Sequence, residues 1–218
     1  MSDPAGLPAG LPDLSHPLSI HIVGAGGAGM NAIGVVLSEM GHQVSGSDLR
    51  ESLGITRLRA MGARITIGHD ADNVGTVDAV VHSTAVAADN VELERARAKA
   101  IPVWRRAEIL RAVCDLRRTV AVAGTHGKTT TSSMLSLCLA ASGMSPSFLV
   151  GGDLNEIGSG AVWDDDGDLF VVEADESDGT FVELGAPVVL VTNIEPDHLD
   201  FHGSVEALHA AFDDFVAG

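Results

Sequence analysis

The chain has 218 residues, 45% of them hydrophobic, which is enough to bury one large core or two modest ones and excludes a disordered chain. No apolar run approaches the roughly 20 residues of a membrane-spanning helix, and residues 1–19 lack Lys and Arg, which argues against a secretory signal. The net charge of −17 arises entirely in residues 129–218, which contain 17 acids and no Lys or Arg, and an acidic half argues against nucleic-acid binding.

The N-terminal segment and the cysteines give two further expectations. Residues 1–18 carry Pro, Gly and Leu and are expected to form a flexible tail. Cys114 and Cys138 lie among apolar neighbours in predicted helices, which favours buried free thiols. Free thiols are consistent with a reducing, cytoplasmic compartment.

A glycine-rich turn follows the first predicted strand, at residues 20–23. Gly24, Gly26 and Gly29 form the pattern G-x-G-x-x-G, with Gly27 as an additional glycine. Glycines let the backbone approach a pyrophosphate, and the N-terminus of a following helix faces its charge. A turn that only packs a helix against a strand is the alternative.

The elements after this turn strengthen the case for a nucleotide. A helix is predicted over residues 28–40 and a strand over 43–46. Asp48 follows about 20 residues after the last glycine, where Rossmann-like sites place an acid on a ribose hydroxyl. The segment therefore predicts a site for a nucleotide diphosphate.

Strands and helices continue to alternate through the first half of the chain. Strands are predicted at residues 64–67, 78–82 and 101–104, and helices at 53–61, 90–100 and 105–113. This alternation predicts an α/β fold with a doubly wound parallel sheet, and the helix at 90–100 is expected to have a solvated charged face. Because ligands bind outside the carboxyl ends of parallel strands, His69, His82, Ser83 and Thr84 are candidates to line one cleft.

A second strand, turn and helix begin after a predicted domain boundary near Leu116. Residues 120–123 read as a strand, Gly124 to Gly127 as a turn, and residues 128–142 as a helix. The N–H groups of such a loop cradle phosphates, and Lys128 can reach terminal phosphates, so a nucleoside triphosphate is the expected ligand. The generic P-loop pattern fails here, because it has four residues between its glycines and this loop has two. An ordinary glycine turn is the alternative.

Polar residues gather where later strands end. A strand is predicted at 147–150, a turn at 151–155, a loop at 156–168, strands at 169–172 and 187–191, and a last helix at 203–216. Glu173 follows one of these strands and is the first candidate Mg²⁺ ligand, helped by the hydroxyl of Thr129. Asn193 and Asp197 could position ligands, and His198, in the same cluster, is a possible ligand or polariser. The three consecutive acids at 164–166 are expected to be a solvated surface.

Five ordered motifs carry a family resemblance. They are Gly-Ala-Gly-Gly-Ala-Gly-Met at residue 24, Val-Ser-Gly-Ser-Asp at 44, Ala-Gly-Thr-His-Gly-Lys-Thr-Thr-Thr at 123, Glu-Ala-Asp-Glu-Ser-Asp at 173 and Thr-Asn-Ile-Glu-Pro-Asp-His-Leu-Asp at 192. Together they resemble the Mur ligases, from about residue 19 to the end. Gly-Thr-His-Gly-Lys-Thr is that family's own form of the ATP-binding turn, which accounts for the short loop.

The resemblance implies a fold and a reaction. It implies a Rossmann-like UDP-sugar domain at residues 19–116 and part of a P-loop-type α/β ATPase domain at 117–218. ATP would phosphorylate the carboxylate of UDP-N-acetylmuramate, and the amine of L-alanine would attack the acyl phosphate, in peptidoglycan precursor biosynthesis in the cytoplasm. ATP and Mg²⁺ are the implied cofactors. Catalysis would depend on positioning and charge neutralisation.

The resemblance also implies roles for individual residues. ATP would be bound by Gly124, Thr125, His126, Gly127, Lys128, Thr129 and Thr130. Lys128 would contact the β- and γ-phosphates, Thr129 and Glu173 would hold Mg²⁺, and His198 would serve a second metal or the reacting phosphate. The UDP moiety would be bound by Gly26, Gly27, Gly29 and Asp48. His69, Ser83 and Thr84 are added to this site from their place at the carboxyl ends of the predicted strands.

Two departures and three alternatives accompany the resemblance. Family members are roughly twice as long, so the chain is expected to be a fragment without the C-terminal domain, and it has no Lys after Lys128 to serve as the carbamylated lysine that several relatives use. A murein-peptide ligase of the same family, a nucleotide-dependent dehydrogenase and a non-catalytic binding fragment are the alternatives. The second phosphate loop argues against a dehydrogenase.

Overall fold

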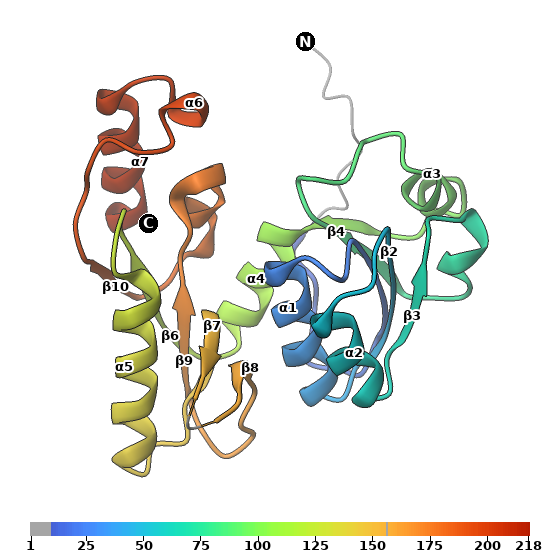
Figure 1. The fold of residues 1–218 in the computed structure, drawn as a ribbon, viewed down its shortest axis with the longest axis horizontal. Coiled ribbons are helices and arrows are strands. Elements are labelled where there is room, and N and C mark those ends of the chain that lie inside the picture. Colours follow the sequence, from blue (N-terminus) through green and yellow to red (C-terminus); the bar gives the residue numbers. More distant parts are fainter. Residues whose placement is uncertain (1–9, 156) are drawn as a thin grey trace. The chain divides into compact units, whose positions relative to one another are not determined.

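The computed structural model describes residues 10–155 and 157–218. The chain divides into two compact units, one ending at Ala112 and the other beginning at Val113. In Figure 1 the ribbon is coloured along the sequence, from blue and green in the first unit to yellow and red in the second. The boundary predicted near Leu116 lies just beyond this division. Each unit has its own sheet and its own buried core.

The first unit is built on a parallel sheet. Its strands are β1 (Ser19–Val23), β2 (Gln43–Asp48), β3 (Arg64–Ile67), β4 (Ala79–His82) and β5 (Val103–Arg105). They are parallel and lie in the order β3-β2-β1-β4-β5. Ile20, Ile22 and Val23 of β1 are fully buried, as expected for a central strand that is covered on both faces. The predicted doubly wound parallel sheet is confirmed.

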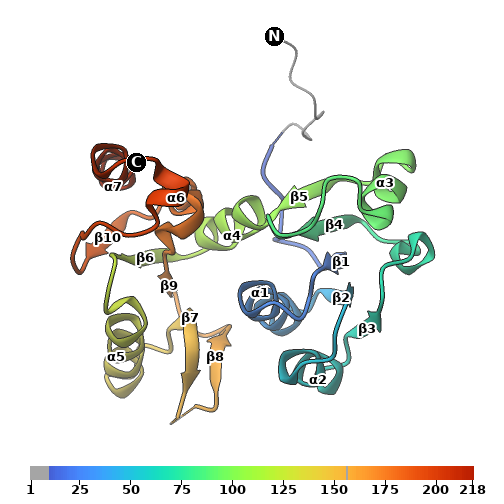
Figure 2. The same ribbon diagram turned by 45° about the horizontal axis from the view of Figure 1, so that its top comes forward.

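The helices of the first unit lie on both faces of this sheet. They are α1 (Ala28–Glu39), α2 (Leu53–Ala60), the 3₁₀ helix η1 (Ala71–Val74), α3 (Val91–Ala98) and α4 (Arg106–Asp115), which runs across the division between the units. Figure 2 shows α1 and α2 on one side of the strands and α3 on the other. Polar side chains cap the starts of α2 and α3: Ser52 accepts from the Ile55 N–H, and Asn90 accepts from the Glu92 N–H.

Part of the predicted N-terminal tail packs on the first unit. Leu14 is buried, and the Leu18 N–H donates to His42 Nδ1 at 3.0 Å. Burial lowers the pKa of His42, which keeps its Nδ1 available as an acceptor. Residues 1–9 of the predicted tail lie outside the described residues.

The second unit contains a mixed sheet. Its strands are β6 (Arg118–Ala123), β7 (Ser147–Leu154), β8 (Ser159–Val162), β9 (Leu169–Glu173) and β10 (Val188–Val191). They lie in the order β10-β6-β9-β7-β8, and β8 runs antiparallel to β7 while the other pairs are parallel. The central strands β6 and β9 bury Val122 and Phe170 completely.

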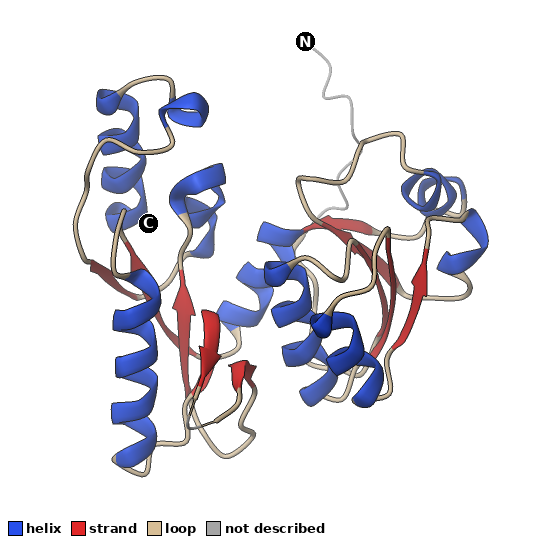
Figure 3. Cartoon of the chain, viewed as in Figure 1, coloured by secondary structure: helices blue, strands red, loops and turns tan. Residues whose placement is uncertain are grey.

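Helices flank the sheet of the second unit, as Figure 3 shows. They are α5 (Lys128–Ala141), the 3₁₀ helices η2 (Glu176–Asp178) and η3 (Thr180–Leu184), α6 (Leu199–His202) and α7 (Val205–Ala217). α5 packs against β6, β7 and β9. The ring of Phe181 in η3 packs against two rings of α7, with its centroid 5.1 Å from that of Phe212 and 5.0 Å from that of Phe215. The last helix, predicted over residues 203–216, is confirmed as α7 (Val205–Ala217).

The prediction for residues 151–162 was wrong. β7 continues to Leu154 where a turn was expected, and β8 lies within the predicted loop 156–168, of which residue 156 is outside the described part. A Cβ at Gly160 would lie 2.7 Å from the Gly152 carbonyl oxygen. The glycines that suggested a loop therefore allow two strands to approach closely.

The prediction for Cys138 was also wrong, because α5 buries a polar face. Cys114 is buried as expected, but Cys138 is exposed, and neither forms a disulfide within the described residues. Ser132 and Ser136 are fully buried, and their hydroxyls donate to the Lys128 carbonyl at 2.8 Å and the Ser132 carbonyl at 2.9 Å. Hydroxyls satisfied within their own helix can face the sheet. No described helix combines the length and the apolar surface that a bilayer-spanning segment requires.

Candidate functional site

The loop between β6 and α5 requires glycine where it leaves the sheet. Gly124 has a φ of +131°, and a Cβ there would overlap Thr192 Oγ1 and lie 2.9 Å from the Asn193 carbonyl oxygen. Gly127 has a φ of +81°, and a Cβ there would meet open space. It is the N-cap of α5 and has no side chain to cap the helix. The first N–H groups of α5 are therefore open to an anionic ligand.

This loop is tied to the segment that follows β10. The N–H groups of Thr125 and His126 donate to the Asn193 carbonyl and to Asn193 Oδ1, each at 3.0 Å. Thr192 Oγ1 donates to the His126 carbonyl at 2.7 Å, and the Glu195 N–H donates to Thr125 Oγ1 at 2.9 Å. The N–H groups of Thr125 and His126 are thus already used, and the donors left for a phosphate lie at the start of α5.

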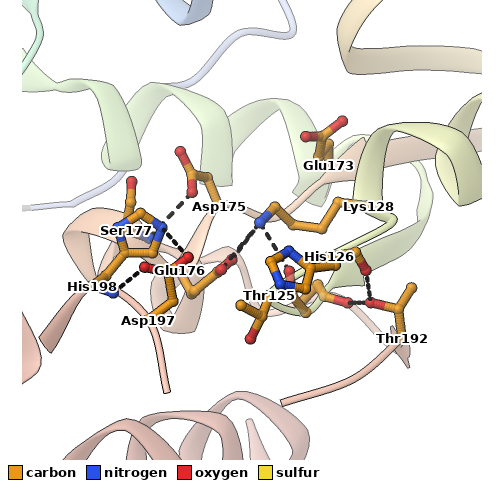
Figure 4. Close-up of polar contacts among 12 residues, drawn as sticks. Thr125, His126, Lys128, Glu173, Asp175, Glu176, Ser177, Thr192, Asp197 and His198 are labelled. Atoms are coloured by element: carbon orange, nitrogen blue, oxygen red, sulfur yellow. Dashed lines mark hydrogen bonds and ion pairs between the residues drawn. The ribbon is translucent and has the colours of Figure 1, made fainter. Parts of the chain in front are cut away.

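Lys128 is paired with a buried carboxylate. Its Nζ donates to the Gly124 carbonyl at 2.8 Å and to the two carboxylate oxygens of Glu176 at 3.0 and 2.8 Å (Figure 4). An ammonium group has three N–H donors, so these contacts use all of them. The side chain of Glu176 is 1% exposed and that of Lys128 is 13% exposed. A phosphate that binds Lys128 must take over at least one of these donors.

The sequence reasoning selected Glu173 and missed Glu176. β9 ends at Glu173, and the chain then turns into η2, where the Asp175 carboxylate accepts from the Ser177 N–H at 3.1 Å. This turn directs the side chain of Glu176 to Lys128. The sequence Asp-x-Ser is a signal for such a turn, but it does not show which acid of the cluster meets the lysine.

Thr129 and Glu173, the first two predicted Mg²⁺ ligands, lie together. Thr129 Oγ1 donates to Glu173 Oε1 at 3.0 Å, and the Gly151 N–H donates to Glu173 Oε2 at 2.7 Å. Adjacent hydroxyl and carboxylate oxygens suit Mg²⁺, so the residues present fit this ion. Thr130, the last predicted ATP-binding residue, is exposed at the start of α5.

His198, the third predicted metal ligand, lies apart from this pair. Figure 4 shows the pair formed by Lys128 and Glu176 between His198 and Glu173. The His198 N–H donates to Asp197 Oδ1 at 2.8 Å. Within residues 10–155 and 157–218, no group of three His, Cys, Asp or Glu side chains is placed to hold a metal ion. The structure thus brings together two of the three predicted ligands.

The glycine turn between β1 and α1 is held by the neighbouring strand β2. The N–H groups of Gly24 and Ala25 donate to the Ser47 carbonyl at 2.9 and 3.0 Å, and the Gly26 N–H donates to Asp48 Oδ2 at 2.8 Å. A Cβ at Gly26 would lie 2.9 Å from the same oxygen. Asp48 therefore supports the turn directly, and its contact with a ribose hydroxyl stays a prediction.

The other predicted sugar-nucleotide residues are distributed around this turn. Gly27 is the N-cap of α1 and has no capping side chain. A Cβ at Gly29 would lie 3.0 Å from the guanidinium of Arg106, and a Cβ at the first glycine of the turn would lie 3.8 Å from Ser83 Oγ. Thr84 is exposed in the turn after β4. Of these two residues, the structure thus places Ser83 near the turn, beside Gly24.

The helix predicted to have a solvated charged face contains a buried carboxylate. Glu92 of α3 is fully buried and accepts from Ser47 Oγ at 2.5 Å, Asn73 Nδ2 at 2.7 Å and the Asp70 N–H at 3.2 Å, while His21 Nε2 lies 3.3 Å away. Burial alone raises the pKa of Glu92, but the hydrogen bonds from His21, Ser47 and Asn73 lower it to about 2. Glu92 is therefore ionised at neutral pH, and nothing in the local sequence distinguishes it from a surface acid.

His69, a predicted sugar-nucleotide residue, is attached to this carboxylate. Its Nδ1 lies 3.0 Å from Ser47 Oγ and 3.5 Å from Glu92 Oε2, and its side chain is 19% exposed. His82 Nδ1 instead lies 3.0 Å from the Ser83 carbonyl, and burial lowers its pKa. Of the two histidines, His69 is the one connected to the strand that holds the glycine turn.

Two family descriptions match the chain in succession. The "Mur ligase family, catalytic domain" matches residues 19–118, and the "Mur ligase middle domain" matches residues 122–218. Two curated relatives, both named UDP-N-acetylmuramate–L-alanine ligase, are similar along most of the chain. The protein of Sinorhizobium medicae is 49% identical over 197 residues, which is 90% of this chain and 42% of the relative. That of Saccharopolyspora erythraea is 51% identical over 201 residues, which is 90% of this chain and 41% of the relative.

Solved structures give the same relationship. The UDP-N-acetylmuramate-alanine ligase of Thermotoga maritima superimposes with a TM-score of 0.85 at 33% identity, covering 92% of this chain and 47% of that one. The UDP-N-acetylmuramate:L-alanyl-gamma-D-glutamyl-meso-diaminopimelate ligase of Neisseria meningitides gives 0.84 at 30%, covering 93% and 68%. The chain spans about 42% of the length of its curated relatives. With two family domains in succession and these structural neighbours, the chain belongs to the Mur ligase family.

Proposed function

We propose that the protein is an ATP-dependent ligase that joins L-alanine to the carboxylate of UDP-N-acetylmuramate through an acyl phosphate, in the cytoplasm. The first unit would bind the sugar nucleotide and the second would bind ATP. The observation that carries the proposal is Lys128 at the open N-terminus of α5, behind a loop that only glycine can form at Gly124. Identity near 50% to relatives named as UDP-N-acetylmuramate–L-alanine ligases supports this substrate pair.

The nucleotide site would use a short set of donors. The loop residues Gly124, Thr125, His126 and Gly127 would shape the cradle, and the N–H groups of Lys128, Thr129 and Thr130 would bind phosphate oxygens. The Lys128 ammonium would exchange a contact to Gly124 or Glu176 for a phosphate oxygen. Thr129 and Glu173 would hold Mg²⁺, which supplies charge neutralisation when bound, and a role for His198 at a second metal or the reacting phosphate stays a prediction.

The sugar-nucleotide site would be formed by the first glycine turn. Its proposed residues are Gly26, Gly27, Gly29, Asp48, His69, Ser83 and Thr84. The turn and the start of α1 present backbone N–H groups to a pyrophosphate. Asp48 and Ser47 hold these groups in place from β2.

Thermal unfolding with added ligands tests this proposal. A ligand that binds only the folded chain stabilises it by about 2.7 kcal/mol at a hundredfold excess over its Kd. We expect UDP-N-acetylmuramate to raise the melting temperature of the chain by several degrees and NAD, the control nucleotide, to leave it unchanged. Stabilisation by NAD and not by the UDP-sugar would contradict the proposal and favour a dehydrogenase.

A murein-peptide ligase is the second candidate, favoured by the structural similarity to the protein of Neisseria meningitides. Both candidates share the UDP-sugar and ATP and differ in the incoming amine. Phosphate release by the complete protein, measured with L-alanine and with L-alanyl-γ-D-glutamyl-meso-diaminopimelate in parallel, separates them. Turnover with the peptide alone would replace the alanine ligase assignment.

A further inference from the structure

A buried set of polar side chains joins four parts of the first unit. This Glu92 network consists of Glu92 on α3, His21 on β1, Ser47 on β2, and His69 and Asn73 after β3. Glu92, His21 and Ser47 are each no more than 1% exposed. The network lies behind the glycine turn, and only His69 belongs to the proposed sugar-nucleotide site.

The negative charge of Glu92 determines the direction of the hydrogen bonds. An ionised carboxylate only accepts hydrogen bonds, so the Ser47 hydroxyl donates to it at 2.5 Å. The oxygen of Ser47 can then only accept from His69 Nδ1, which is 3.0 Å away. His69 therefore carries a proton on Nδ1, and in the neutral ring its Nε2 is an acceptor.

The backbone of Ser47 also holds the glycine turn. Its carbonyl accepts from the N–H groups of Gly24 and Ala25, while the Asp48 carbonyl accepts from the Gly68 N–H at 2.8 Å, directly before His69. One end of β2 is thus connected to the turn, to the loop that carries His69 and, through the Ser47 hydroxyl, to the buried charge.

Burying the Glu92 carboxylate costs free energy, because the charge loses its hydration. An apolar side chain of similar volume would avoid the desolvation of a buried charge, and such replacements are often neutral or stabilising. An apolar side chain could not, however, accept from the Ser47 hydroxyl or determine which nitrogen of His69 is protonated. The arrangement therefore indicates a role beyond packing.

We propose that Glu92 is a positioning residue of the sugar-nucleotide site. It holds Ser47 beneath the glycine turn, and through Ser47 it keeps His69 in the Nδ1–H tautomer, whose Nε2 accepts a hydrogen bond from a hydroxyl of the bound sugar nucleotide. This inference rests on the proposed function, which assigns the turn to a sugar nucleotide.

Ser45 offers a matched control for the test. It lies on β2, two residues before Ser47, is buried, and its Oγ lies 3.0 Å from His21 Nδ1. Ser47→Ala and Ser45→Ala each remove one buried hydroxyl from the same strand, but only Ser47→Ala removes the hydroxyl that bridges Glu92 and His69, whose Nδ1 then keeps only its direct approach of 3.5 Å to Glu92 Oε2. A difference between the two variants therefore reports on positioning rather than on the loss of a buried hydroxyl.

The first measurement needs no ligand. Side-chain ¹⁵N chemical shifts of the histidines report which ring nitrogen carries the proton. We expect His69 to be the Nδ1–H tautomer in the unaltered chain and in Ser45→Ala, to show a weaker preference in Ser47→Ala, where Glu92 Oε2 remains 3.5 Å from Nδ1, and to lose the preference in Glu92→Gln. An Nε2–H tautomer of His69 in the unaltered chain overturns the inference, whether or not any sugar nucleotide binds.

The second measurement is the Kd of UDP-N-acetylmuramate by calorimetry. We expect Ser47→Ala and Glu92→Gln to raise it roughly fivefold, as for the loss of one hydrogen bond between neutral groups, and Ser45→Ala to change it less than about twofold. Equal Kd values for Ser47→Ala and Ser45→Ala overturn the positioning role. Absence of binding to the unaltered chain contradicts the proposed function instead, and the tautomer measurement then still decides whether Glu92 directs His69.

Discussion

The two glycine turns begin alike and are supported in different ways. Each leaves a buried strand at a glycine with positive φ, +83° at Gly24 and +131° at Gly124, and each leads into a helix whose N-cap is a glycine. The first turn is held from β2 by a backbone carbonyl and the Asp48 carboxylate. The second is held by Asn193 and carries its own cation, Lys128.

The difference lies in where the charge is placed. In the first unit the buried charge of Glu92 is behind the turn and contacts it through Ser47, so that under our proposal it would act on a ligand only through the residues that it positions. In the second unit the charge pair of Lys128 and Glu176 lies within the loop itself, and an arriving phosphate must compete for it. The same strand, turn and helix pattern therefore has its charge behind the turn in one unit and within the loop in the other.

The largest expected effect concerns the pair in the second unit. Lys128→Ala leaves the Glu176 carboxylate buried without its partner, so we expect the free energy of unfolding to fall by about 3–5 kcal/mol. Adding Glu176→Gln should recover much of this loss, because the uncompensated charge is removed. Urea unfolding of the single and double variants gives the coupling energy. Strictly additive losses would show that the pair does not interact in solution.

The buried charge of the first unit should appear in the pH dependence of stability. Because the pKa of Glu92 falls from 4.5 to about 2 on folding, its contribution is present above pH 4.5 and is lost as the pH falls toward 2. The shift corresponds to about 3 kcal/mol. We expect the difference in unfolding free energy between the unaltered chain and Glu92→Gln to shrink over this range.

Unfolding in urea at a series of pH values measures this difference. His42 and His82, whose pKa values are lowered by burial, destabilise both proteins equally below about pH 6.5, so they cancel. A difference that stays constant from pH 7 to pH 2 would mean that Glu92 is not stabilised as a carboxylate.

The smallest expected effect is the difference in stability between alanine substitutions at the two glycines of the second loop. Gly124→Ala and Gly127→Ala both place a side chain at positive φ, but only the first collides with Thr192 and Asn193. We expect both to cost about 1–2 kcal/mol for the backbone and Gly124→Ala to cost roughly 2 kcal/mol more for the overlap. Equal melting temperatures of the two variants would contradict the close contact between this loop and the segment after β10.

Local patterns were sufficient for the framework of both units. The alternation of strands and helices, the two glycine turns, and the placement of Lys128 and Glu173 beside one loop all follow from spacing and residue type. The strand β8 was missed, since Gly152 and Gly160 suit a loop as well as a close pair of strands. Cys138 was placed on the wrong face, since the buried serines of α5 satisfy their hydroxyls within the helix.

Two buried carboxylates, Glu92 and Glu176, could not be identified from the sequence. The motifs alone were enough to locate two glycine turns between a strand and a helix and the lysine at the second, because turn and helix signals act over a few neighbouring residues. Glu92 and Glu176 look like surface acids in the sequence, yet they are buried against partners 45 and 48 residues away. Only the packed structure selects them, because burial and charge pairing depend on which distant strands and turns surround a side chain.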